Sequence, residues 1–243
     1  MEPITRALPL LGVILLSAVP AVHAQSTGPA TEKFFVNVNF GYQLADRSLK
    51  ASAQKTIYEE TATLNSSQLV EKGALIDFAV GYRVWGDVFA GVGISRFSDN
   101  ETATTDARIP DPIFFSRPKT VTGSTSDLKR TELAITPHAL WILPLTDRLD
   151  LSAAVGVSII QLSQDLVGDF TVPAGTQNVN VATTNETVTG VGPFAQIDFI
   201  FNINAMYGVG GFVRYAGAKV DLPSSADHNI GGMIAGAGIR LRF

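Results

Sequence analysis

Residues 34–44 read FFVNVNFGYQL, and every second side chain of this stretch is large and apolar. One face of an extended chain would carry Phe34, Val36, Val38, Phe40 and Tyr42. The opposite face would carry mostly polar or small residues. A period of two residues is that of a β-strand, because successive side chains point to opposite faces of a sheet. The stretch therefore predicts a strand with one apolar and one mixed face.

The same alternation recurs seven more times along the chain. It appears in residues 76–83, 88–95, 132–141, 149–158, 191–199, 207–215 and 233–243. Segments of this length suit the roughly 9–11 residues that a tilted strand needs to cross the hydrocarbon of a membrane. The sequence therefore predicts eight strands, an even number.

Connections between these segments alternate between two length classes. Three are tight turns, at 85–86, 144–147 and 202–204. The other four are long and mostly polar: 45–73, 98–127, 163–187 and 216–229. The first of these is most simply a solvated hairpin that extends above the membrane. Short turns at one end and long loops at the other are typical of an outer-membrane barrel, whereas a soluble β-sandwich has no reason to sort its loops in this way. We therefore predict an all-β fold, an eight-stranded antiparallel up-and-down transmembrane β-barrel with four long outer loops, over residues 34–243.

The composition agrees with a chain that faces something other than water. Of the 243 residues, 46% are hydrophobic and only 16% are charged, against about a quarter in a typical globular domain. The net charge of -4 leaves no basic excess for a nucleic-acid partner, and the lack of cysteine excludes disulfides and thiolate chemistry. Residues 1–24 combine Arg6, an apolar run and a small-residue ending, which predicts a cleaved signal peptide before a short segment, 25–33.

Aromatic residues gather near the predicted short turns. Rings with a polar edge favour the headgroup boundary of a membrane, so we predict one aromatic girdle there. Its members are Phe34, Tyr82, Trp85, Trp141, Phe199, Tyr207 and Phe243. Tyr42 and Tyr215, at the other ends of their strands, are candidates for a second girdle.

The chain ends Gly238-Ile239-Arg240-Leu241-Arg242-Phe243, with apolar residues at every second place before a terminal aromatic residue. This ending resembles the assembly signal of bacterial outer-membrane barrels, carried here by Gly238, Leu241 and Phe243. With the signal peptide and eight strands, the chain resembles the small barrels of the OmpA, OmpX and OmpW type. The resemblance implies the outer membrane of a Gram-negative bacterium, insertion by the barrel assembly machinery, and contact with lipid and lipopolysaccharide. We expect a monomer without cofactor.

Charged residues fall on the face predicted to point into the barrel. They are Asp77, Arg83, Asp87, Glu132, His138, Asp150, Asp198, Arg214, Arg240 and Arg242. Eight strands enclose a space that side chains can fill, and an isolated charge there would be costly. We therefore favour a plug of ion pairs over a conducting pore, with Arg83, Arg240 and Arg242 facing Asp87, Asp150 and Asp198 near the periplasmic end.

The long segment 98–127 contains a proline-stiffened apolar patch within a polar, Thr-rich sequence. The patch comprises Ile109, Pro110, Pro112, Ile113, Phe114 and Phe115. Exposed apolar clusters of this kind bind partners. Two alternatives stay open: the patch binds a surface ligand, or it folds back over the barrel mouth.

Enzymatic chemistry lacks a convincing set of residues. After signal-peptide cleavage only His138 and His228 remain. A metal site with both would need a lumen residue and a loop residue to meet, so we predict no metal. The pair Asp227-His228 in the last outer loop is a weak parallel to outer-membrane proteases. The favoured function is a non-enzymatic barrel that displays surface loops, with narrow, porin-like passage of small solutes as a possibility; an adhesin and a lipid A deacylase or protease are the alternatives.

Two prolines conflict with the predicted strands. Pro137 and Pro193 lie inside them, yet proline has no N–H to donate to a ladder and a closed barrel has no free edge. We predict a β-bulge at each.

Overall fold

The computed structural model describes residues 32–44, 47–70, 72–175, 178–222 and 225–243, and the regular structure of these residues is β-strand. The predicted signal peptide, 1–24, and most of segment 25–33 lie outside them. No helix among the described residues is long and apolar enough to cross a membrane. The ten strands are β1 (Phe34–Gln43), β2 (Arg47–Ile57), β3 (Glu60–Val70), β4 (Ala74–Trp85), β5 (Val88–Ile109), β6 (Lys119–Pro144), β7 (Leu149–Thr171), β8 (Asn180–Asn202), β9 (Tyr207–Leu222) and β10 (Ser225–Arg242).

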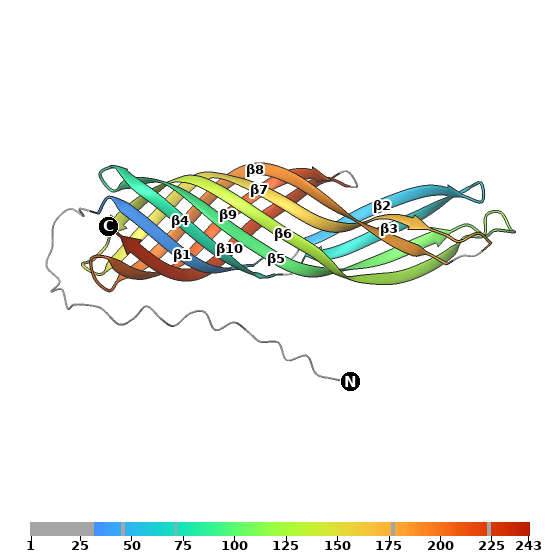
Figure 1. Ribbon diagram of the computed structural model, residues 1–243, viewed down its shortest axis with the longest axis horizontal. Helices are drawn as coiled ribbons and strands as arrows, with labels where there is room; N and C mark the ends of the chain where they lie inside the picture. Colours follow the sequence, from blue (N-terminus) through green and yellow to red (C-terminus); the bar gives the residue numbers. More distant parts are fainter. Residues whose placement is uncertain (1–31, 45–46, 71, 176–177, 223–224) are drawn as a thin grey trace, which may run out of the picture.

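Eight of these strands close into a ring (Figure 1). Antiparallel pairings run in the order β4–β1–β10–β9–β8–β7–β6, and β5 pairs with both β4 and β6 to complete the circle. The first and last ring strands meet with Phe35 opposite Arg242. Each of the eight segments predicted from the two-residue period lies on a different ring strand. The predicted fold class is therefore confirmed.

The ring strands turn their large apolar side chains outward. Phe40, Ile76 and Val155, for example, are mostly exposed, whereas the polar side chains of Asn39 and Asp198 are buried inside. This arrangement is the reverse of a water-soluble protein, in which large apolar residues are hidden. It fits a wall that faces lipid, and every backbone group of a closed ring can pair within the sheet, as hydrocarbon requires.

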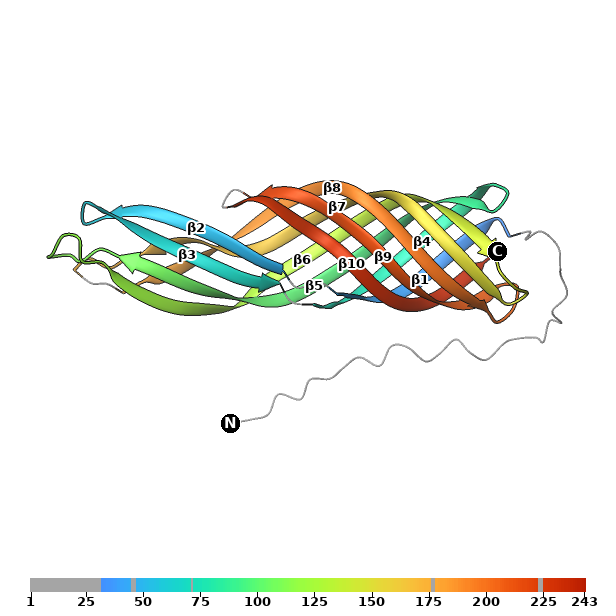
Figure 2. The same cartoon turned by 180° about the vertical axis from the view of Figure 1, so that it is seen from behind.

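The long outer segments are mostly strand, which corrects the prediction of loops at 98–127, 163–187 and 216–229. Segment 45–73 forms the β2–β3 hairpin, as predicted, and β3 joins the sheet by pairing with β5. The β5–β6 and β7–β8 ladders continue far above the ring, so that Figures 1 and 2 show a projection nearly as long as the barrel. In the projection the outward side chains are mainly Thr, Ser and charged residues, so the apolar outward stripe that marks the ring strands is missing. Threonine nevertheless favours strands.

The two prolines do not produce the predicted bulges. Pro193 pairs with Val157 in a regular ladder, and the β8–β9 ladder ends one residue later at Phe194. Pro137 pairs regularly with Val92, but the β6–β7 ladder is interrupted there without a change of register. Each strand therefore accommodates the missing N–H by losing pairing on one side only. The bulge in β6 lies instead at Ser126 and Asp127, which both face Thr102, and the φ of Asp127 is 63°.

Candidate functional site

The mouth of the barrel near the short turns holds two of the predicted ion pairs. Arg242 Nη1 lies 2.7 Å from Asp150 Oδ2, which also accepts a hydrogen bond from Asn202. Arg83 lies 3.6 Å from Asp87 and stacks over the ring of Phe89. Asp87 is exposed in the turn, so it lies at the rim and not in the lumen as predicted. These pairs leave the charges of the mouth mutually compensated.

A connected polar chain crosses the middle of the barrel. Arg240 Nε lies 2.6 Å from Asp198 Oδ2, and Arg214 Nη1 lies 2.8 Å from Asp77 Oδ2. Asn39 joins the two pairs, because its oxygen accepts a hydrogen bond from Arg240 and its amide nitrogen donates one to Asp77. All five side chains are buried. Asn39 was not among the predicted lumen residues, although the same two-residue period places it inward.

His138 is a packed interior residue. Its Nδ1 lies 2.8 Å from the backbone oxygen of Thr136, and its ring contacts those of Phe35 and Phe194. Among the residues that the structure describes, no group of three or more His, Asp or Glu side chains could hold a metal ion. The side chain of Asp227 lies outside the described part of the chain, so the Asp227-His228 pair has no geometry to report. His138 thus offers packing and not a catalytic arrangement.

A second polar cluster, which we call the upper lock, lies above the membrane-facing wall. It consists of Gln68, Glu101, Arg130, Glu132 and Gln164, contributed by four strands. Arg130 Nη2 lies 2.5 Å from Glu132 Oε1, and its Nη1 donates to Gln164. Glu101 Oε2 accepts hydrogen bonds from Gln68 at 2.7 Å and from Gln164 at 3.3 Å. Of the five, only Glu132 is among the predicted lumen residues. Gln68, Glu101 and Gln164 fall in the predicted long connections, and Arg130 lies between the connection 98–127 and the strand segment 132–141.

Glu101 is the unusual carboxyl group of the upper lock. Its side chain is fully enclosed, and the nearest cation, Arg130 Nε, lies 3.7 Å away. Arg130 makes its shorter contacts with Glu132, so its charge only partly offsets the burial of Glu101. Burial therefore raises the pKa of Glu101 to about 7. The group lies outside the hydrocarbon, because the outward residues of β5 become polar from Arg96 onward.

Apolar side chains fill the interior between these polar groups. One cluster, around Phe35, Phe89, Leu140 and Phe194, lies beside the polar chain, and another, around Phe97 and Phe212, packs nearby. Higher clusters are built on Ile160 and Leu162, and within the projection on Leu64, Ile109 and Phe170. The interior is thus occupied by side chains along its length.

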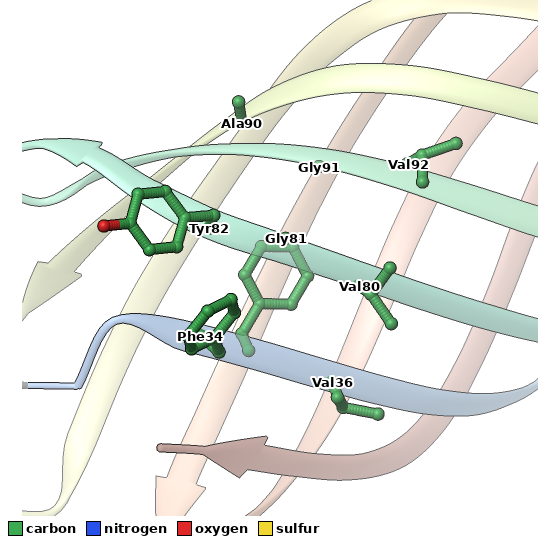
Figure 3. Close-up of a pocket in the computed structure, with 9 residues that line it drawn as sticks. Phe34, Val36, Val80, Gly81, Tyr82, Ala90, Gly91 and Val92 are labelled. Atoms are coloured by element: carbon green, nitrogen blue, oxygen red, sulfur yellow. The ribbon is translucent and has the colours of Figure 1, made fainter.

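A shallow hollow lies on the outside of the wall, near the short-turn end (Figure 3). This groove of about 660 Å³ runs between Phe34, Tyr82 and Val92, over the small residues Gly81 and Ala90. A side chain at Gly81 would overlap the ring of Phe35, which packs beneath it. Because the groove is apolar and opens toward lipid, it belongs to the membrane-facing surface and not to a solute path.

The proline-stiffened patch divides into a buried and an exposed part. Ile109 and Pro110 are buried within the projection, and Pro112 is half-buried. Ile113, Phe114 and Phe115 are 76%, 56% and 71% exposed in the loop between β5 and β6, which lies at the end of the projection farthest from the ring (Figure 1). We call these three residues the distal tip. The expectation that the patch folds back over the barrel mouth is therefore wrong.

The aromatic residues that the sequence assigns to a girdle point outward from the barrel wall. Its members Phe34, Tyr82, Trp85, Trp141, Phe199, Tyr207 and Phe243 are all exposed. Phe34 and Tyr82 pack edge to face, and the backbone of Phe243 hydrogen-bonds to that of Phe34. In the terminal segment, Gly238 and Leu241 lie on β10 opposite β1. Rings exposed at one level of a closed apolar wall mark the headgroup boundary. The chain is a transmembrane β-barrel.

Comparisons with known proteins found similar solved structures but no relative by sequence. No model of a protein family matches the sequence, and no curated protein matches it. Similar solved structures include the outer membrane protein OprG from Pseudomonas aeruginosa, at 10% identity and a TM-score of 0.48, over 89% of this chain and 98% of that one. Neisserial surface protein A is 15% identical, with a TM-score of 0.44, over 86% and 97%. Ail of Yersinia pestis, solved with a heparin analogue, is 9% identical, with a TM-score of 0.39, over 86% and 99%.

Proposed function

We propose that this barrel is a closed, non-enzymatic anchor in the outer membrane of a Gram-negative bacterium, which holds a rigid β-projection out from the cell surface. The observation that carries the proposal is the filled interior, where the polar chain and the upper lock are each cross-linked between strands. A conduit would need a continuous path past these buried ion pairs. Narrow passage of small solutes is therefore the less favoured alternative.

The setting of this anchor follows from the sequence resemblance and the apolar wall. We propose secretion by the signal peptide, insertion by the barrel assembly machinery, and a monomer surrounded by lipid and lipopolysaccharide. The C-terminal residues Gly238, Leu241 and Phe243 would act as the assembly signal, which fits their place on the strand that closes the ring. No cofactor, metal or nucleic acid is needed for this role.

A conductance measurement tests the closed state. The purified full-length protein, inserted into a planar lipid bilayer, is expected to give no conductance steps at any applied voltage, because packed side chains and paired charges block the interior. A general porin inserted into the same bilayer serves as the positive control. Steps of constant size from the unmodified protein would contradict the closed anchor and support the solute conduit.

A further inference from the structure

The distal tip gathers apolar side chains where the surroundings are water. Most other large exposed apolar side chains among the described residues lie on the ring strands or in the short turns, where they face the membrane or its boundary. Ile113, Phe114 and Phe115 instead lie at the far end of the projection (Figures 1 and 2). Exposed apolar clusters of this kind mark surfaces that are covered in the working state. The tip thus requires an occupant that lies away from the protein's own membrane.

Backbone N–H groups of the distal tip already have hydrogen-bond acceptors within the protein. Asp111 Oδ1 accepts hydrogen bonds from the N–H groups of Ile113, at 2.8 Å, and Phe114, at 3.0 Å. Glu60 Oε1, on the neighbouring β3, accepts a hydrogen bond from the N–H of Ser116 at 2.8 Å. Unpaired backbone donors are costly in an apolar medium, and here three donors of the turn region, those of residues 113, 114 and 116, are already satisfied by side chains. These bonds also fix the turn, which lowers the ordering cost of binding.

Basic side chains lie directly behind the apolar ones. The Arg117 guanidinium stacks over the ring of Phe114, 5.5 Å from its centroid, and Lys119 begins the next strand. Both are exposed. Aromatic residues followed by cations match the depth profile of an anionic bilayer, in which hydrocarbon lies beneath a layer of phosphates. The nearby Asp111 and Glu60 carboxylates accept hydrogen bonds from the backbone of the turn. Because these charged groups lie close to the apolar side chains, insertion is limited to the outer layer of such a bilayer.

The size of the tip favours a lipid surface over a protein. One large aromatic side chain buries roughly 150–250 Å², so three side chains bury less than the roughly 800 Å² per partner of a standard protein interface. Partition into a bilayer needs no complementary surface. The tip is also a convex end and not a groove.

We propose that Ile113, Phe114 and Phe115 insert shallowly into an opposing bilayer that contains anionic phospholipid, with Arg117 and Lys119 at its phosphates. The inference rests on the proposed function, in which the projection points away from its own membrane. Many copies on one cell would act together, so weak single contacts would add up to stable attachment.

Vesicle capture tests this proposal with the full-length protein in immobilised phosphatidylcholine nanodiscs. Vesicles of phosphatidylcholine with phosphatidylserine are expected to bind, and vesicles of phosphatidylcholine alone to bind more weakly. The double variant Phe114→Ser, Phe115→Ser should lower capture at least tenfold. The variant Arg117→Ala, Lys119→Ala should remove the preference for phosphatidylserine. The matched control Thr122→Ala, Ser124→Ala changes exposed polar residues of the same hairpin and should capture vesicles normally.

Heat-dependent migration on gels confirms that each variant is folded. Equal capture by the phenylalanine variant and the unmodified protein would overturn the proposal, and so would a complete lack of capture by the unmodified protein. Binding to a protein-coated surface that depends on the two phenylalanines, without vesicle capture, would assign the tip to a protein partner and would also overturn it. None of these results touches the closed anchor, which the conductance measurement tests separately.

Discussion

Replacing Arg240 with alanine is expected to lower the free energy of unfolding by about 3–5 kcal/mol, the range for a buried ion pair that loses one partner. Arg240 and Asp198 are both almost fully enclosed, and Arg240 also donates to Asn39. The variant would leave the Asp198 carboxylate inside the barrel without its counter-charge. It would also break the link between Asp198 and Asn39, through which the polar chain continues to Asp77.

Urea unfolding of the protein in lipid vesicles measures this effect. Arg242→Ala is the matched control. Asp150 keeps the hydrogen bond from Asn202 when Arg242 is removed, and the Arg242 side chain is already 15% exposed, so the loss should be clearly smaller. The double variant Arg240→Met, Asp198→Leu should recover most of the lost stability, since an apolar pair of similar volume leaves no buried charge. A loss for Arg240→Ala no larger than that for Arg242→Ala would show that the polar chain does not hold the barrel interior together.

The sequence predicts the ring and much of its polar interior because lipid imposes a simple rule on it. In a strand that separates hydrocarbon from a packed lumen, successive side chains must point alternately outward and inward. Asp198 and Arg240 can therefore be assigned to the interior from their odd or even place in the strand alone. Short turns then fix which residues lie at the same height. This is why the pairs Arg240–Asp198 and Arg242–Asp150 fall within the predicted set.

Above the membrane the same rule no longer applies, and the prediction was weaker there. Outward residues of the projection meet water, so the apolar stripe disappears and a strand reads as a polar loop. The only trace of a strand pattern left there is the inward series Ala103, Ala107 and Ile109 on β5. This series is weak, because two of its members are small and polar residues lie between them. Glu101 and Arg130 were missed for this reason. Pairing between β3 and β5 depends on contacts distant in the sequence, which periodicity cannot reveal.

Replacing Glu101 with glutamine is expected to remove the fall in stability that this carboxyl group causes between about pH 4.5 and about pH 7. In the folded protein the pKa of Glu101 is raised from 4.5 to about 7, chiefly by burial. Between these values the folded state holds a proton that the unfolded state has released, so stability falls as pH rises and is level above about 7. The shift corresponds to about 3 kcal/mol at neutral and higher pH, which the variant should regain.

Urea unfolding at pH 5 and pH 8 measures the stability of the unmodified protein and of Glu101→Gln. All other groups titrate in both proteins, so the difference between the two pH dependences reports on Glu101. From pH 5 to pH 8 the unmodified protein should lose stability relative to Glu101→Gln. The glutamine side chain can still accept the hydrogen bond from Gln68. Glu132→Gln is the matched control: it removes the counter-charge closest to Arg130 and should destabilise the barrel at both pH values. The same pH slope for Glu101→Gln and the unmodified protein would mean that Glu101 carries no proton at pH 5 in the folded state. In that case Arg130 would have to neutralise both carboxylates, although its contact with Glu101 is 3.7 Å and that with Glu132 is 2.5 Å.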